Sequence, residues 1–318
     1  MKKLAARPLR PAVTAKSCAM RVTLIRVMLF AVIGLPLFAA IGLPSVPAAQ
    51  AQPASRSAEP QVRVDLDAPS QASGEAGSLA EKLQNPIADL ISVPFQNNTN
   101  FNVGPHKGVQ NILNIQPVVP IHVNDDWNVI TRTIVPLTWS PSYQPAASVP
   151  PFGVGVTSFS AFLSPTKTFD GWTWGTGPII GLPTITNKFL GSNVWGAGPA
   201  VVAVRTAHPW VYGLLVNNLF SLGGTSDRGG TSYSIMTINP FVNYNFGGSW
   251  FVGTVPIITA SWKTGGEKWT LPVGMQGGRL IKVAGKLPVN LVVGAYYNAL
   301  RPSGAGTWQL RTQIAFIF

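Results

Sequence analysis

The last stretch of the chain, residues 308–318, alternates between apolar and polar side chains. Successive side chains of a strand point to opposite faces. One face is therefore apolar and edged by Trp308 and Phe318, while Gln309, Arg311 and Gln313 lie on the other. An apolar, aromatic-edged face beside a wet one is typical of a membrane β-barrel strand, and a soluble sandwich strand rarely ends on such an aromatic. The pattern predicts that Gln309 and Arg311 face a lumen.

The same weak alternation recurs in about twelve strand-length segments after Pro86, separated by turn residues. The segments are 87–101, 109–123, 127–139, 153–163, 172–182, 195–206, 210–222, 232–246, 250–262, 269–282, 288–300 and 307–318. An even number of antiparallel strands brings both ends of the barrel sequence to one side of the membrane. Lipid tolerates only helices or sheets without a free edge. We therefore predict an all-β fold, a transmembrane antiparallel β-barrel of about twelve strands over residues 85–318.

Short and long connections alternate along the chain, which supports the barrel independently. The expected short turns are 124–126, 164–171, 207–209, 247–249 and 284–286, and the expected longer loops are 140–152, 183–194, 223–231, 263–268 and 301–306. Short turns are typical of the periplasmic end of such barrels, and longer loops of the outer end.

Tryptophans bracket two of the predicted strands. Trp127 and Trp139 share one parity, as do Trp250 and Trp262. Tryptophan favours the headgroup level of a membrane, so these pairs predict two aromatic girdles. A soluble β-protein would more often bury such tryptophans at mid-strand.

Proline is the main difficulty for this prediction. Several prolines fall inside predicted strands: Pro94, Pro117, Pro120, Pro136, Pro178, Pro199, Pro240, Pro256 and Pro272. Proline removes a ladder donor and normally lies at edges or bulges. We expect these prolines to mark kinks or bulges that help the wall to curve.

The first residues have a different character from the rest of the chain. Seven basic residues, an apolar run over 22–43 and the small residues at 49–51 predict a cleaved signal peptide at 1–51. A membrane anchor is the alternative, and Met20 is a second candidate initiator. Residues 52–84 read as a disordered periplasmic lead, ending in one short helix from the capping box at Ser78 and Glu81. We expect this helix to be a frayed surface turn rather than a plug.

Charge and cysteine content narrow the function classes. Without the signal peptide, 16 basic residues face 11 acidic ones, too mild an excess to indicate nucleic-acid binding. The single cysteine, Cys18, lies in the predicted signal peptide, so the exported chain has neither disulfides nor thiolate metal sites. No metal-ligand spacing and no phosphate-binding loop occur, so we expect no cofactor.

The lumen offers candidate binding residues. Strand parity turns a polar set inward, consisting of Gln110, Asn114, Gln116, His122, Arg132, Gln309 and Arg311. Two arginines in a narrow lumen would attract anionic solutes. The alternative, which we favour from the sequence, is a structural role in which the arginines pair with carboxylates such as Asp89.

Enzymatic activity is the other class to weigh, because some twelve-strand barrels are lipases with an outward Ser/His pair. Of the three histidines, His106 and His208 fall in predicted loops or turns and His122 has inward parity. No spacing sets a histidine beside an outward serine, so we predict no catalytic residues.

A family resemblance rests on residues 83–98, 171–178, 195–199 and 210–213. These segments resemble a bacterial family of outer-membrane transporters often labelled "neuromedin U", related to the phenol-degradation meta-pathway family of barrels. The resemblance covers nearly all of the mature chain and implies passage of small, often aromatic compounds, without a motif of functional residues. The C-terminal strand also resembles those whose terminal phenylalanine, here Phe318, is read by the barrel-insertion machinery.

Together these features predict a passive outer-membrane channel for small solutes, among them anionic or aromatic ones, with outer-membrane lipid and the insertion machinery as partners. A non-conducting structural or adhesive barrel is the alternative.

Overall fold

The computed structural model describes residues 78–141, 151–223, 232–284 and 287–318. All of these belong to one compact unit of the chain. The predicted signal peptide and most of the predicted lead, residues 1–77, lie outside the described residues.

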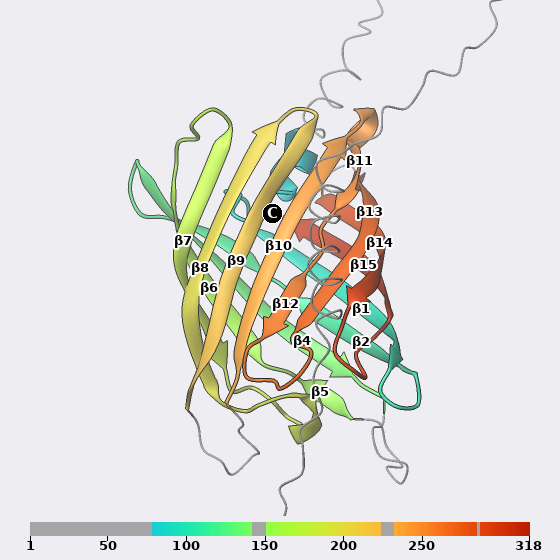
Figure 1. Ribbon diagram of the computed structural model, residues 1–318. Coiled ribbons are helices and arrows are strands. Elements are labelled where there is room, and N and C mark those ends of the chain that lie inside the picture. Colours follow the sequence, from blue (N-terminus) through green and yellow to red (C-terminus); the bar gives the residue numbers. More distant parts are fainter. Residues whose placement is uncertain (1–77, 142–150, 224–231, 285–286) are drawn as a thin grey trace, which may run out of the picture. The chain divides into compact units, whose positions relative to one another are not determined.

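The described residues form a closed antiparallel barrel (Figure 1). Its strands are β1 (Ser92–Val103), β2 (Gly108–Ile115), β3 (Val118–His122), β4 (Trp127–Trp139), β5 (Phe152–Val154), β6 (Thr157–Pro165), β7 (Trp172–Leu182), β8 (Trp195–Ala207), β9 (Trp210–Gly223), β10 (Ser234–Asn245), β11 (Trp250–Thr254), β12 (Ile258–Ser261), β13 (Trp269–Val283), β14 (Leu287–Leu300) and β15 (Trp308–Ile317). Each of β2/β3, β5/β6 and β11/β12 is one interrupted strand, so the wall has twelve strands. Two short 3₁₀ helices, η1 (Lys188–Leu190) and η3 (Gly247–Ser249), lie in connections.

Closure brings the first and last strands together. β1 pairs with β15 from Ser92 opposite Ile317 to Phe101 opposite Trp308. On the far side of the wall, β10 pairs with β9 and with both pieces of β11/β12. Because none of the described strands is left with an unpaired edge, the predicted antiparallel barrel of about twelve strands is confirmed.

The predicted strand limits agree best where alternation is clearest. β4 and β7 match the predicted segments 127–139 and 172–182 at both ends. The predicted start of the first strand at residue 87 is wrong, because β1 begins at Ser92. Ile87 instead lies before the wall and is buried among interior side chains.

Three prolines lie at irregular points of the wall. Pro117 falls in the gap between β2 and β3, and Pro256 falls in the gap between β11 and β12. Pro272 lies beside a register shift between β13 and β14. These positions confirm kinks or bulges at some of the prolines, whereas others, such as Pro178 opposite Pro199, lie within paired strands.

The outer face is apolar and carries the tryptophans. None of the ten tryptophans is buried, and Trp250 and Trp308 are about half exposed. Rings of neighbouring strands contact each other on this face, as in Trp262 with Trp269 and Tyr297 with Trp308. These outward tryptophans agree with girdle positions rather than with burial at mid-strand.

The interior is apolar along one part of the wall. Its core cluster comes from β4 and from β6 through β10, and it includes Val202, Val204 and Val211, which have no exposed surface. Ile87 packs into this cluster from the segment before β1. Among the described residues, no helix is both long and apolar enough to cross a bilayer.

Candidate functional site

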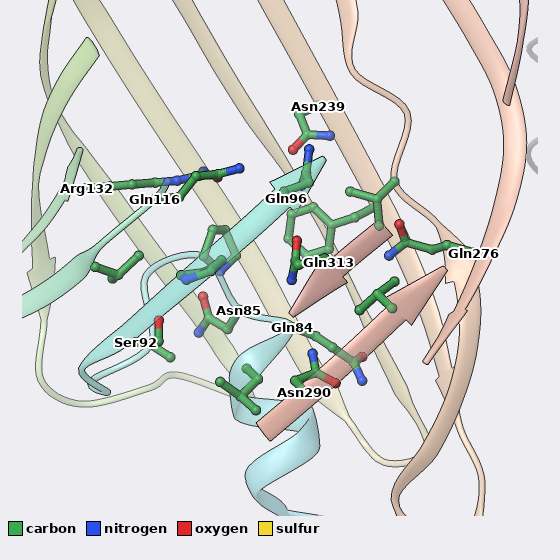
Figure 2. A pocket seen from close by; sticks show the side chains of 18 of the residues that line it. Gln84, Asn85, Ser92, Gln96, Gln116, Arg132, Asn239, Gln276, Asn290 and Gln313 are labelled. Atoms are coloured by element: carbon green, nitrogen blue, oxygen red, sulfur yellow. The ribbon is translucent and has the colours of Figure 1, made fainter. Parts of the chain in front are cut away.

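A cavity of about 230 Å³ opens in the barrel interior (Figure 2). Its polar lining consists mainly of amide side chains with two arginines, and no carboxylate of the described residues lines it. The polar set is Gln84, Asn85, Ser92, Gln96, Asn114, Gln116, Arg132, Asn239, Asn243, Gln276, Asn290, Arg311 and Gln313. Apolar side chains such as Val118, Ile134 and Phe241 complete the lining. The cavity can therefore hold a small molecule with both polar and apolar parts.

Arg311 on β15 is held by several acceptors. Its Nε donates to Asn98 Oδ1 at 3.2 Å, Nη1 to the Val255 carbonyl at 2.8 Å, and Nη2 to Gln309 Oε1 at 3.3 Å. Its guanidinium also lies over the Tyr296 ring, with Cζ 4.6 Å from the ring centroid. The residue is only 2% exposed. Arg311 is therefore tied into the wall.

The Tyr296 hydroxyl completes this group of contacts. It accepts a hydrogen bond from the Val255 amide at 3.2 Å and donates to Gln276 Oε1 at 3.1 Å. Val255 lies in the gap between β11 and β12, where both its amide and its carbonyl are bonded by interior side chains. Arg311 and Tyr296 thus hold the interrupted strand in place.

Arg132 on β4 has a different environment. One hydrogen bond is formed to another side chain, from its Nη2 to Gln116 Oε1 at 2.5 Å. Figure 2 shows the two side chains lying along each other beside the cavity. The residue is half-buried, and its guanidinium borders the cavity. Most of its N–H donors have no acceptor among the described residues.

The expected pairing of the arginines with Asp89 is wrong, and among the described residues no ion pair joins Arg132 or Arg311 to a carboxylate. Asp89 Oδ2 pairs with His122 Nε2 at 3.1 Å instead. The prediction failed because residues 87–91 do not form a strand. They lie at the mouth of the barrel, the end at which His122 ends β3. Within the described residues, no strand contains Asp or Glu. Most acids of the predicted lead lie outside the described residues.

The segment before β1 occupies the end of the barrel that carries the short turns. A helix at residues 78–83 packs Ala80 against Leu280 and Ile317. Because Ala80 is only 2% exposed, the expectation of a frayed surface turn is wrong. The apolar contacts of this helix come from strands distant in sequence, which local patterning does not reveal.

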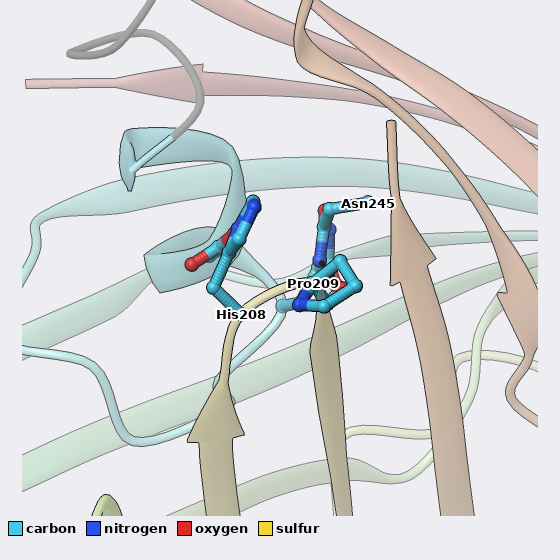
Figure 3. Close-up of polar contacts among 5 residues, drawn as sticks. His208, Pro209 and Asn245 are labelled. Carbon is cyan, nitrogen blue, oxygen red and sulfur yellow. Dashed lines mark hydrogen bonds and ion pairs between the residues drawn. The ribbon is translucent and has the colours of Figure 1, made fainter. Parts of the chain in front are cut away.

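Polar contacts hold the same segment to two turns (Figure 3). His208 Nδ1 lies 2.5 Å from Glu81 Oε1. Gln84 Nε2 donates to Asn245 Oδ1 at 2.6 Å, and Asn245 Nδ2 donates to the Pro209 carbonyl at 3.0 Å. The 78–91 segment is therefore bonded to the mouth on several sides.

The other candidate residues lie in the interior or at its ends. Asn114 and Gln116 line the cavity. Gln309, Asn100, Gln110 and Ser140 form a ladder of side-chain hydrogen bonds across β15, β1, β2 and the end of β4, each bond 3.1 Å long. Whether these residues bind a solute stays a prediction.

Sequence reasoning missed two kinds of residue in the interior. The contacts of Tyr296 and Val255 depend on a strand break whose side-chain partners come from other strands. Asn243 and Asn290 are buried beside the cavity, and their Oδ1 atoms have no hydrogen-bond partner among the described residues. Their inward parity was a signal in the sequence that could have identified them.

The histidines lie at the ends of the barrel. His106 is in the exposed turn between β1 and β2, while His122 and His208 pair with Asp89 and Glu81. The described part of the chain contains no group of three or more His, Cys, Asp or Glu side chains placed to hold a metal ion.

Comparisons with solved structures find outer-membrane proteins that are similar to this chain. An outer membrane channel from Pseudomonas putida F1 matches with a TM-score of 0.51 and 14% identity, over 72% of this chain and 94% of the other. The NanC porin matches with a TM-score of 0.45 and 9% identity, over 72% and 98%. Outer membrane phospholipase A from Escherichia coli matches with a TM-score of 0.38 and 13% identity, over 76% and 98%.

The likeness to the Pseudomonas channel shows a shared fold. No protein-family model and no curated protein sequence matches the chain. The resemblance to the phenol-degradation meta-pathway family therefore stays a prediction.

Proposed function

We propose that the chain is an outer-membrane β-barrel through which small solutes, among them anionic or aromatic ones, pass passively. The observation that supports this most directly is the contrast between the two faces of the closed wall. The outer face is apolar with exposed tryptophans, and the interior carries a cavity lined by amides and arginines. A face pattern of this kind suits a barrel in lipid with a wet interior.

The proposed orientation follows from the connections. The start of β1, the end of β15 and the short turns lie at one end of the barrel, which we assign to the periplasm. Export through the predicted signal peptide and recognition of Phe318 by the insertion machinery belong to the same proposal.

A second candidate is a non-conducting structural barrel. It is favoured by the apolar core around Val202 and by the helix at residues 78–83, since both fill part of the interior. The two candidates differ in one property, which is whether a solute crosses the wall through the lumen.

Solute entry into proteoliposomes separates the two candidates. Vesicles containing the folded protein and trapped dextran are diluted into isosmotic arabinose, and swelling is followed by light scattering. We expect arabinose to enter faster than in protein-free vesicles while dextran stays inside, which excludes general leakage. Equal entry rates with and without the protein would favour the structural barrel.

A further inference from the structure

We propose that Arg132 is the anion-binding residue of the interior cavity, and that the cavity takes small organic monoanions with an apolar group. The physiological meaning of this site rests on the proposed channel function, because the channel would deliver the anion. The binding itself does not require conduction.

The two interior arginines are not equivalent. Arg311 uses its guanidinium to bond three acceptors and to cover the Tyr296 ring, and it is almost fully buried. Arg132 bonds only Gln116 among the described side chains and borders the cavity. A guanidinium has five N–H donors in a planar fork that matches a carboxylate. Arg132 uses one of its five donors in a bond to a described side chain, whereas Arg311 uses three of its five and is only 2% exposed. Arg132 can therefore offer two donors to a ligand more readily than Arg311.

Among the described residues, no carboxylate compensates the charge of Arg132. The acidic residues of the described chain lie in turns, in loops and in the 78–91 segment, and none lies in a strand. The two acids at the mouth, Glu81 and Asp89, face His208 and His122. An enclosed positive charge that has no carboxylate partner in the described part of the chain favours an anion over a neutral or cationic solute.

The rest of the lining indicates what the anion carries. Gln96, Asn114 and Gln313 supply further hydrogen-bonding amides, whereas Val118, Ile134 and Phe241 supply apolar surface. One available guanidinium matches one negative charge. The volume of about 230 Å³ limits the ligand to a small molecule. These features together fit a carboxylate attached to a ring or a short hydrocarbon group.

Equilibrium dialysis with radiolabelled benzoate tests the site on the detergent-solubilised full chain, with empty micelles subtracted. We expect the labelled benzoate to bind saturably and to be displaced by unlabelled benzoate. Unlabelled acetate and benzylamine should displace it much less. Acetate lacks the apolar group and benzylamine carries the opposite charge. Competition by either one equal to that of benzoate would overturn the assigned ligand class.

Variants of one position and a matched control locate the site. Arg132→Gln should weaken benzoate binding by at least about tenfold, because it removes the charged donors. Arg132→Lys should bind more tightly than Arg132→Gln, since it keeps the charge but loses the fork. Arg279→Gln removes an equal charge on the outer face, where Arg279 lies over the Trp250 ring, and should leave binding unchanged.

Folding of each variant is checked by heat-modifiable migration on gels. If folded Arg132→Gln binds benzoate as the original chain does, the assignment of Arg132 is wrong. Arabinose entry into proteoliposomes separates this failure from failure of the proposed function. Lost benzoate selectivity with intact arabinose entry would overturn the site alone, and benzoate binding without arabinose entry would support the site and overturn the channel.

Discussion

Arg311 links the last strand to the interrupted strand β11/β12. Its bond to the Val255 carbonyl and its position over Tyr296 hold a strand break that Pro256 creates by lacking an N–H. Buried charges of this kind need several partners, and Arg311 has them in amide and carbonyl oxygens rather than in carboxylates. The residue therefore stabilises the wall.

Substitution of Arg311 tests this structural role. Arg311→Gln should lower the free energy of unfolding by about 2–4 kcal/mol, because it removes charged hydrogen bonds and the stacking on Tyr296. Tyr296→Phe keeps the ring and loses only the hydroxyl contacts, so it should cost about 1 kcal/mol. Urea unfolding of the vesicle-inserted protein measures both. A smaller loss for Arg311→Gln than for Tyr296→Phe would contradict this role.

Some residues of the candidate site could be predicted from the sequence. Parity alone indicates the inward direction of Arg132 and Arg311, and both border the cavity in the structure. The partners could not be predicted in the same way. Val255 and Tyr296 reach Arg311 across several strands, and Asp89 meets His122 because the chain before Ser92 lies in the mouth. Such contacts depend on closure of the wall rather than on local pattern.

Among the secondary-structure elements, β6 with β7 and β8 with β9 approach closely at glycines. A Cβ atom at Gly198 would lie 1.7 Å from the Asn218 carbonyl oxygen, and one at Gly177 would lie 1.8 Å from the Ala161 carbonyl oxygen. Both glycines precede prolines, Pro178 and Pro199, that face each other across β7 and β8. The two strands therefore require small residues to keep their neighbours close.

Gly198→Ala tests this close approach. Because the added methyl group meets backbone atoms, the strands must separate, and we expect a loss of about 1–3 kcal/mol in stability. Gly265→Ala is the matched control, since a Cβ there meets no atom within 4 Å. Thermal unfolding of both variants in one detergent shows the difference. Equal midpoints would mean that the close approach at Gly198 is not needed.

Strand prediction succeeded where alternation is strong and bounded by tryptophan, as in β4 and β7. It failed at residues 87–91, which form no strand and from which Ile87 belongs to the interior core rather than to the wall. It also joined β2 with β3 and β11 with β12 across their prolines. The alternation of side chains does not reveal where proline leaves a strand without a backbone N–H donor. These breaks become visible only once the pairing of the strands is known.

For the whole molecule, closure determines what the interior can do. The pairing of β1 with β15 removes the last free edge of the sheet. The closed wall then separates an apolar outer face from an interior that has polar and apolar parts. Strand number and antiparallel order were accessible from the sequence, because both follow from counting segments and turns. The filling of the interior was not, since Ile87 and the helix at 78–83 enter it from outside the wall.

The proposed channel and the filled interior lead to different expectations for ion flow. If the 78–91 segment narrows a continuous passage, its contacts at His208 and Asn245 should limit conductance without abolishing it. If the apolar core, which includes Ile87, closes the lumen by itself, removing the residues before Pro86 should change little. A chain that begins at Pro86 therefore distinguishes the two cases.

Single-channel recording in planar bilayers tests the central proposal most directly. We expect small discrete conductance steps from the full exported chain and larger steps from the chain that begins at Pro86. Heat-modifiable migration on gels checks that both proteins are folded. Folded protein that inserts but gives no steps in either form would contradict passage of solutes through this barrel.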